Sequence, residues 1–179
     1  DNSILNRYLA MKTKCFALSV FFALFGAVMK AQNFEVPKNY VLNVAADYAK
    51  YEKDIIACAN WMENTPLNVD QQKRIEANTF LMKWLTGSPT VTINLNADIV
   101  VKCTDKNSDL LMLFLAGWTR YSLENNYSKD QQKGYFEGFK SMINMYNKGI
   151  LIKKDKDLEG LIAIYDKGEL ESWIKDNIK

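Results

Sequence analysis

The run LLMLFLAGW, residues 110–118, constrains the fold more than any other segment of the domain. It contains no charged side chain, and the chain becomes polar only from Thr119 onward. A helix that is apolar on all sides is stable in water only where other elements cover it. The run therefore predicts a central buried helix, which ends near Asn125 and Asn126.

Several other segments supply helices that can cover it. Apolar residues recur at helical spacing in segments 41–63, 68–85, 128–147, 157–165 and 169–177, with a weaker short helix over 97–103. Asn68 and Ser128 are each followed three residues later by glutamine, which predicts that they are N-caps. Residues 90–96 alternate like a strand but have no convincing partner strand. We predict an all-α fold: a single-domain bundle of five to seven helices with one short extended connector around residues 90–96.

Two glycines, Gly134 and Gly138, lie four residues apart within the helix predicted over 128–147. Residues four apart share one face of a helix. This spacing predicts that a neighbouring helix or a large aromatic side chain approaches that face closely.

Residues 1–31 have the features of an export signal. Lys12 and Lys14 precede the uncharged run 15–29, which fits the apolar region of a signal peptide and is short for a membrane span of about 20 residues. We expect residues 1–10 to be upstream or added residues, 11–31 to be a signal peptide, and 32–179 to be a single helical domain. Cleavage after Ala31 would give a periplasmic or secreted protein. An uncleaved signal anchor or a buried helix is the alternative.

The composition excludes several chemistries. The chain has no histidine, so it has no Ser-His-Asp triad, Cys-His dyad or His-ligated zinc or haem. Residues 1–31 carry four of the 23 basic and one of the 21 acidic residues, so the remainder has a net formal charge of −1. A nucleic-acid-binding protein is expected to keep a basic face, and we therefore predict no nucleic-acid partner. The chain also has no glycine-rich phosphate loop, and we expect no cofactor.

Two cysteines remain in the predicted mature chain, Cys58 and Cys103. In an oxidising compartment they can form a single disulfide. The alternative is that both are buried thiols that pack as small apolar side chains. The sequence leaves both alternatives open.

One acidic segment has the outline of a calcium loop. Asp155, Asp157, Glu159 and Asp166 follow the spacing of calcium ligands, with a glycine at the sixth position. The last ligand position normally holds glutamate, and the apolar spacing of residues 158–165 favours a helix over the same segment. The alternative is an acidic helix N-terminus, which the helix dipole favours. We therefore expect no metal site and keep these residues as a weak candidate.

The candidate binding residues lie at the end of the central helix: Trp118, Arg120, Tyr121 and Glu124. An arginine between aromatic residues can stack and can bind a carboxylate or phosphate. The alternative is that Arg120 marks the point where the helix leaves the core and pairs locally with Glu124.

Two segments, residues 84–89 and 116–125, resemble parts of exported all-helical bacterial proteins that belong to no named family. The resemblance covers about a fifth of the chain. It implies an exported location and a helical fold, and it implies no activity.

These features favour a non-enzymatic binding protein. We expect its partner to be another protein or a cell-envelope component, and an inhibitor or immunity-type role lies within this class. We expect membrane contact only through the signal segment if that segment is uncleaved. The alternative is a small envelope hydrolase that uses paired carboxylates, which needs no histidine.

Overall fold

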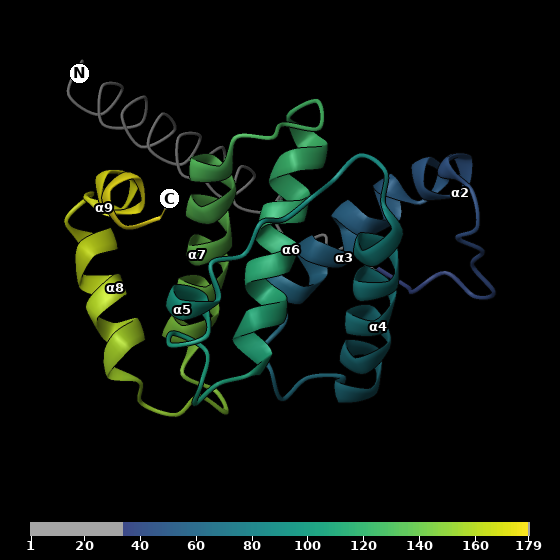
Figure 1. The fold of residues 1–179 in the computed structure, drawn as a ribbon. Coiled ribbons are helices and arrows are strands. Elements are labelled where there is room, and N and C mark those ends of the chain that lie inside the picture. Colours follow the sequence, from purple (N-terminus) through teal and green to yellow (C-terminus); the bar gives the residue numbers. More distant parts are fainter. Residues whose placement is uncertain (1–33, 179) are drawn as a thin grey trace, which may run out of the picture. The chain divides into compact units, whose positions relative to one another are not determined.

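A computed structural model describes residues 34–178, and the predicted signal peptide lies outside these residues. Within them the chain is all-helical, as predicted (Figure 1). The helices are α2 (Ala45–Lys50), α3 (Glu52–Asn64), α4 (Gln71–Gly87), α5 (Ala97–Val100), α6 (Asp109–Glu124), α7 (Gln131–Lys148), α8 (Lys156–Asp166) and α9 (Leu170–Asn177). The described part has one helix more than the seven predicted segments, because the first of them breaks at Tyr51 into α2 and α3.

The central helix prediction is confirmed. Helix α6 packs along α7, with α3 against both and α4 against α3 and α6 (Figure 1). Helices α8 and α9 lie on the other side, where α9 contacts α7. The core side of α6 is fully buried, whereas Leu111 and Leu115 on its other side are half-buried.

Glycines allow the close packing of α6 and α7. A Cβ atom at Gly117 would lie 2.6 Å from the backbone oxygen of Glu137, and one at Gly138 would lie 2.7 Å from the ring of Phe114. A Cβ atom at Gly134 would overlap the indole of Trp118. The predicted close approach at Gly134 and Gly138 is therefore confirmed, and in both cases an aromatic side chain is the group that approaches.

An aromatic cluster fills the contact between the two central helices. The ring centroids of Trp118 and Tyr135 are 4.7 Å apart, and those of Phe114 and Phe139 are 5.2 Å apart. Tyr135 also donates its hydroxyl to the carbonyl oxygen of Asn94 at 2.8 Å and accepts the amide of Asn96. A side chain of α7 therefore bonds to the backbone of residues 90–96, which is an extended connector as predicted.

Two helices begin later than predicted. The N-cap of α4 is Asp70 rather than Asn68, and the N-cap of α7 is Asp130 rather than Ser128. Each aspartate accepts the backbone amide of the lysine three residues on, at 3.4 Å for Lys73 and 3.1 Å for Lys133. A carboxylate suits the positive end of the helix dipole better than a neutral side chain does.

Candidate functional site

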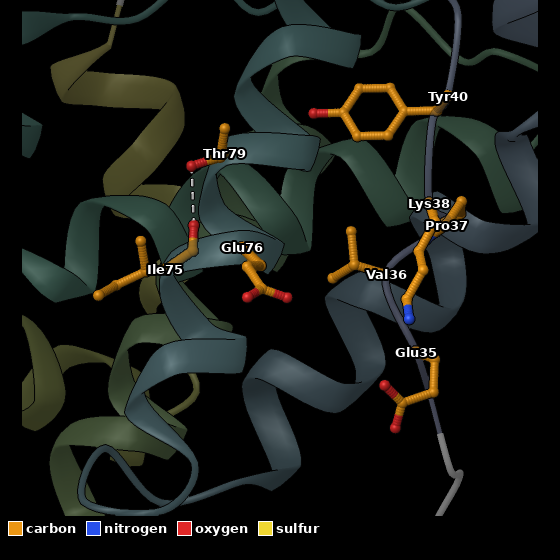
Figure 2. Close-up of a pocket in the computed structure, with 8 residues that line it drawn as sticks. All are labelled: Glu35, Val36, Pro37, Lys38, Tyr40, Ile75, Glu76 and Thr79. Atoms are coloured by element: carbon orange, nitrogen blue, oxygen red, sulfur yellow. Dashed lines mark hydrogen bonds between the residues drawn. The ribbon is translucent and has the colours of Figure 1, made fainter.

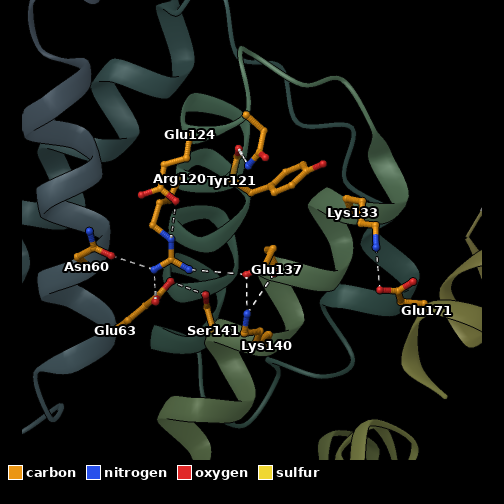
Figure 3. Close-up of polar contacts among 11 residues, drawn as sticks. Asn60, Glu63, Arg120, Tyr121, Glu124, Lys133, Glu137, Lys140, Ser141 and Glu171 are labelled. Atoms are coloured by element: carbon orange, nitrogen blue, oxygen red, sulfur yellow. Dashed lines mark hydrogen bonds and ion pairs between the residues drawn. The ribbon is translucent and has the colours of Figure 1, made fainter. Parts of the chain in front are cut away.

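Arg120 lies at the centre of a polar cluster between three helices. Its Nη1 donates to Oδ1 of Asn60 at 3.1 Å and to the carboxylate of Glu63, both on α3 (Figure 3). Oγ of Ser141, on α7, donates to the other oxygen of Glu63. The cluster therefore links α6 to α3 and α3 to α7.

Two further carboxylates lie around the same guanidinium group. Glu137 on α7 is 3.8 Å from Nη2, and Glu124 is 3.9 Å from Nε. Lys140 completes the cluster, with its Nζ 3.1 Å from a carboxylate oxygen of Glu137. Each carboxylate in the cluster thus has a basic partner within ion-pair distance.

Burial differs strongly among these side chains. The Arg120 and Glu63 side chains are only 16% and 11% exposed, whereas that of Glu124 is 48% exposed. Desolvated charges interact more strongly than exposed ones, so the Arg120–Glu63 pair dominates the cluster. The expected local pair with Glu124 exists, but it is longer and more exposed than the pair with α3.

The structure brings three of the four predicted binding residues into one hollow. Arg120, Tyr121 and Glu124 line a hollow of about 380 Å³, while Trp118 is buried in the core against Gly134. Sequence reasoning missed the other lining residues, Asn60, Asn125, Glu137 and Lys140. Of these, only Glu137 and Lys140 have a signal in the sequence, because opposite charges three residues apart on a helix predict an ion pair. Asn60 is far from Arg120 along the chain, and only the packing of α3 on α6 brings it close.

The two cysteines are not joined. Cys58 and Cys103 are both free and buried, which is the second of the two alternatives. The Cys58 sulfur lies 3.6 Å from the carbonyl oxygen of Ala77 on α4, and burial raises the pKa of this thiol to about 12. Burial, with the nearby charges of Asp155 and Asp157, raises the pKa of Cys103 to about 11. Neither thiol is a candidate nucleophile, because a reactive cysteine needs a lowered pKa.

The weak calcium candidate is a helix rather than a loop. Asp155 is the N-cap of α8 and accepts the amides of Asp157 and Leu158 at 3.0 and 3.3 Å. Asp157, Glu159 and Asp166 all lie within α8, so a loop cannot close around an ion. Among residues 34–178 no three His, Cys, Asp or Glu side chains are grouped in a way that could hold a metal ion.

A second candidate site lies on the outer face of α4. We define the α4 stripe as Ile75, Thr79, Met82 and Leu85, which follow one another at helical spacing. Ile75 is 60% and Met82 40% exposed, although both are large and apolar. The Thr79 hydroxyl donates to the carbonyl oxygen of Ile75 at 2.8 Å, so this polar group is satisfied within the helix. The sequence allows either this face or the face with Phe80 and Trp84 to be buried, because both follow the helical period. The structure buries the face with Phe80 and Trp84.

A groove borders one end of the α4 stripe. Figure 2 shows Val36 and Tyr40 of the N-terminal segment opposite α4, where Glu76 lies, and Ile75 and Thr79 of α4 also line the groove. The groove has a volume of about 300 Å³, and its charged residues are Glu35, Lys38 and Glu76. Lys73 pairs with Glu35 at 2.9 Å and so connects α4 to this segment.

An apolar hollow borders the other end of the stripe. It has a volume of about 350 Å³ and lies between α4, the connector and α6. Its apolar lining consists of Met82, Leu85, Val91, Ile93, Leu95, Leu111 and Leu115. The half-buried side of α6 therefore lines this hollow.

Comparison of the chain with known protein families, curated protein sequences and solved structures gave no match. Within the part of the chain that the structure describes, no helix is both long and apolar enough to span a bilayer. The function must therefore be inferred from the residues themselves.

Proposed function

We propose that this chain is an exported, non-enzymatic protein that binds another protein or a cell-envelope component. The observation that carries this proposal is the α4 stripe, with its groove at one end and its apolar hollow at the other. Large apolar side chains that are exposed together next to concave surface are typical of interaction sites. Of the two kinds of partner, this surface favours a protein.

The shape and charge of the surface favour an amphipathic helix as the bound segment. The stripe from Ile75 to Leu85 spans about 15 Å, or nearly three helical turns. Glu76 and Lys83 are both exposed beside it, seven residues apart on the same side of α4. A bound helix whose apolar side packs on the stripe is expected to carry a basic residue near Glu76 and an acidic residue near Lys83.

The alternative of a hydrolase has less support. It requires one carboxyl group that donates a proton and a second carboxylate opposite it. In the cluster around Arg120 the carboxylates of Glu63, Glu124 and Glu137 each pair with a basic side chain. These carboxylates are arranged to hold helices together rather than to face a substrate.

The test compares a double variant of the stripe with a single-residue control in a pull-down from envelope extract. Ile75→Gln with Met82→Gln removes the apolar side chains of the stripe while keeping helix propensity and charge. Val44→Gln is the control, because Val44 is 60% exposed and lies outside the α4 stripe, its groove and its apolar hollow. We expect wild type and the control to retain the same protein, and the stripe variant to lose it by at least tenfold.

The double charge reversal Glu76→Lys with Lys83→Glu tests the orientation of the bound helix. It should weaken binding of the same partner while leaving the unfolding temperature near that of wild type. Equal retention by the stripe variant and wild type would reject the α4 site. Turnover of a retained glycan, with no protein recovered, would favour the hydrolase. Sedimentation of the purified chain shows whether the partner is a second copy.

Export is part of the proposal and rests on residues 11–31. The protein recovered from the periplasm or medium should begin at or near Gln32. N-terminal sequencing or intact mass, allowing for pyroglutamate, measures this directly. Recovery of the intact segment in the membrane pellet would reject cleavage.

A further inference from the structure

The loop between α7 and α8 exposes apolar side chains that the proposed function does not use. We define this loop as residues 149–155. Ile150 is 38% exposed and Leu151 is 64% exposed, the largest exposed fraction of any large apolar residue among those described. An exposed apolar pair at the tip of a loop has an unfavourable contact with water.

The backbone holds Leu151 in this exposed position at a conformational cost. Its φ is 57°, in the left-handed region that a leucine rarely adopts. Two residues further on, the backbone of Lys153 is fixed by Asn107, which donates Nδ2 to the Lys153 carbonyl oxygen at 2.9 Å and accepts its amide at 2.8 Å. The loop is therefore a positioned feature of the fold.

Lysines flank this apolar pair in the sequence. Lys148, Lys153, Lys154 and Lys156 are all exposed, and they fall within nine residues of sequence around the pair. The one acidic residue among them, Asp155, is buried and bonded as the N-cap of α8. The nearest exposed carboxylates in sequence, Asp157 and Glu159, follow on α8, and Glu159 accepts a hydrogen bond from Tyr146.

The segment that carries Asn107 adds to the same surface. Asn107 joins residues 101–108 to the loop, and Figure 1 shows both connections at the same end of the bundle, at the bottom of the view. This segment exposes Val101, Lys102 and Lys106 as well as Asp105. Basic and apolar side chains therefore occur together on both neighbouring segments.

We propose that the α7–α8 loop docks on a bilayer that contains anionic phospholipid, with Ile150 and Leu151 inserted at the headgroup level. Exposed apolar side chains with exposed lysines on both sides in the sequence match the two components of such a surface, its acyl boundary and its negative charge. A nucleic acid would use the lysines alone and would leave Leu151 in water. This contact is independent of the α4 stripe and of the signal segment, which was the only membrane contact that the sequence predicted.

The test measures co-flotation of the exported protein with two kinds of vesicle. One kind contains phosphatidylglycerol and phosphatidylethanolamine, and the other contains phosphatidylcholine alone. The variants are Leu151→Gly, the pair Lys153→Gln with Lys154→Gln, and Val44→Gln as the control, because Val44 is 60% exposed and lies outside the loop and the α4 stripe. Every variant has the same N-terminus as wild type, so differences between them report on the substituted residues.

Wild type and the control should bind the anionic vesicles, with an affinity that falls as salt is added. Removing a lysine near an anionic surface reduces affinity about fivefold, so the Lys153/Lys154 pair should lose more than tenfold. Leu151→Gly should bind about tenfold more weakly. It should nevertheless unfold about 2 °C higher, because glycine adopts a positive φ without strain.

The rise in unfolding temperature separates lost binding from lost folding. The proposal is overturned if wild type does not float with anionic vesicles, or if Leu151→Gly binds them as wild type does. If wild type bound phosphatidylcholine vesicles as strongly as anionic vesicles, the role of the lysines would be overturned. Equal loss of binding in the Val44→Gln control would also overturn the proposal, because the binding surface would then not be the loop.

Discussion

At the residue scale, the glycines of the two central helices determine how closely these helices pack. Gly117 faces the backbone of α7, where a Cβ atom would lie 2.6 Å from the carbonyl oxygen of Glu137. A backbone atom cannot move away as the end of a flexible side chain can. At Gly160, on α8, a Cβ would have no atom within 4 Å apart from the adjoining residues and the backbone of its own helix. The two helical glycines therefore differ only in their surroundings.

Gly117→Ala should destabilise the domain by about 2 kcal/mol, because overpacking outweighs the gain in helix propensity. Gly160→Ala should stabilise it by about 0.5–1 kcal/mol, because alanine favours the helix and meets no neighbour. Urea unfolding of both variants measures the two changes in the free energy of unfolding. A change of the same sign in both would contradict the role assigned to Gly117.

At the element scale, Arg120 links the central helix to α3 and α7. Its partners come from helices that lie far apart in the sequence, and the closest of them is Glu63 on α3. Removing one member of a poorly exposed ion pair leaves the other charge desolvated without a partner. Arg120 is therefore expected to contribute to stability through Glu63 more than through Glu124.

Arg120→Ala should reduce the free energy of unfolding by about 2 kcal/mol, a value between those of exposed and fully buried pairs. Glu124→Ala should cost less than about 0.5 kcal/mol, because its carboxylate is half exposed and 3.9 Å from the guanidinium. In the Arg120→Ala background, Glu63→Gln should recover part of the loss, because it removes the unpaired charge. Chemical denaturation of wild type, Arg120→Ala, Glu63→Gln and the double variant of these two completes a cycle, with Glu124→Ala measured beside it. Equal effects of Arg120→Ala and Glu124→Ala would show that the cluster does not hold the helices together.

At the scale of the whole molecule, the two buried thiols report on unfolding. At about pH 8 neither should react with a chromogenic disulfide reagent in the native state, because burial raises both pKa values. Denaturant without reductant should release two thiols per mature chain, or three if residues 1–31, which include Cys15, are retained. One disulfide, and hence no free thiol in the mature chain, would contradict the structure at this point.

The same pKa shifts predict how stability changes with pH. The pKa values are about 12 for Cys58 and about 11 for Cys103, above the ordinary value of 9. The unfolded chain therefore loses these protons first as the pH rises, and it then binds fewer protons than the native state. The stabilisation that the two raised pKa values give the native state is complete below about pH 8 and declines above pH 9. Comparison of unfolding midpoints between wild type and Cys58→Ala over that range isolates the thiol contribution.

Much of the fold was predictable from the sequence because its signals are local. The apolar run 110–118 requires a covered helix, and periodic apolar residues predict most of the others. The sequence also indicates the positions of the N-caps. Asp-Gln-Gln-Lys occurs at residues 70–73 and again at 130–133, and each copy begins a helix. The predicted caps, Asn68 and Ser128, were wrong because the capping-box pattern was followed in place of this repeat.

Local sequence patterns predict the helices, the central position of α6 and the close approach at Gly134 and Gly138. The tertiary structure selects the buried face of α4, because Ile75 with Met82 and Phe80 with Trp84 fit the helical period equally well. It also decided the partner of Arg120, since Glu63 lies 57 residues away along the chain. Periodicity reports which residues share a face. How all the helices pack together decides which face of a helix is buried against a neighbour. It also decides which distant charged residue lies beside a given side chain.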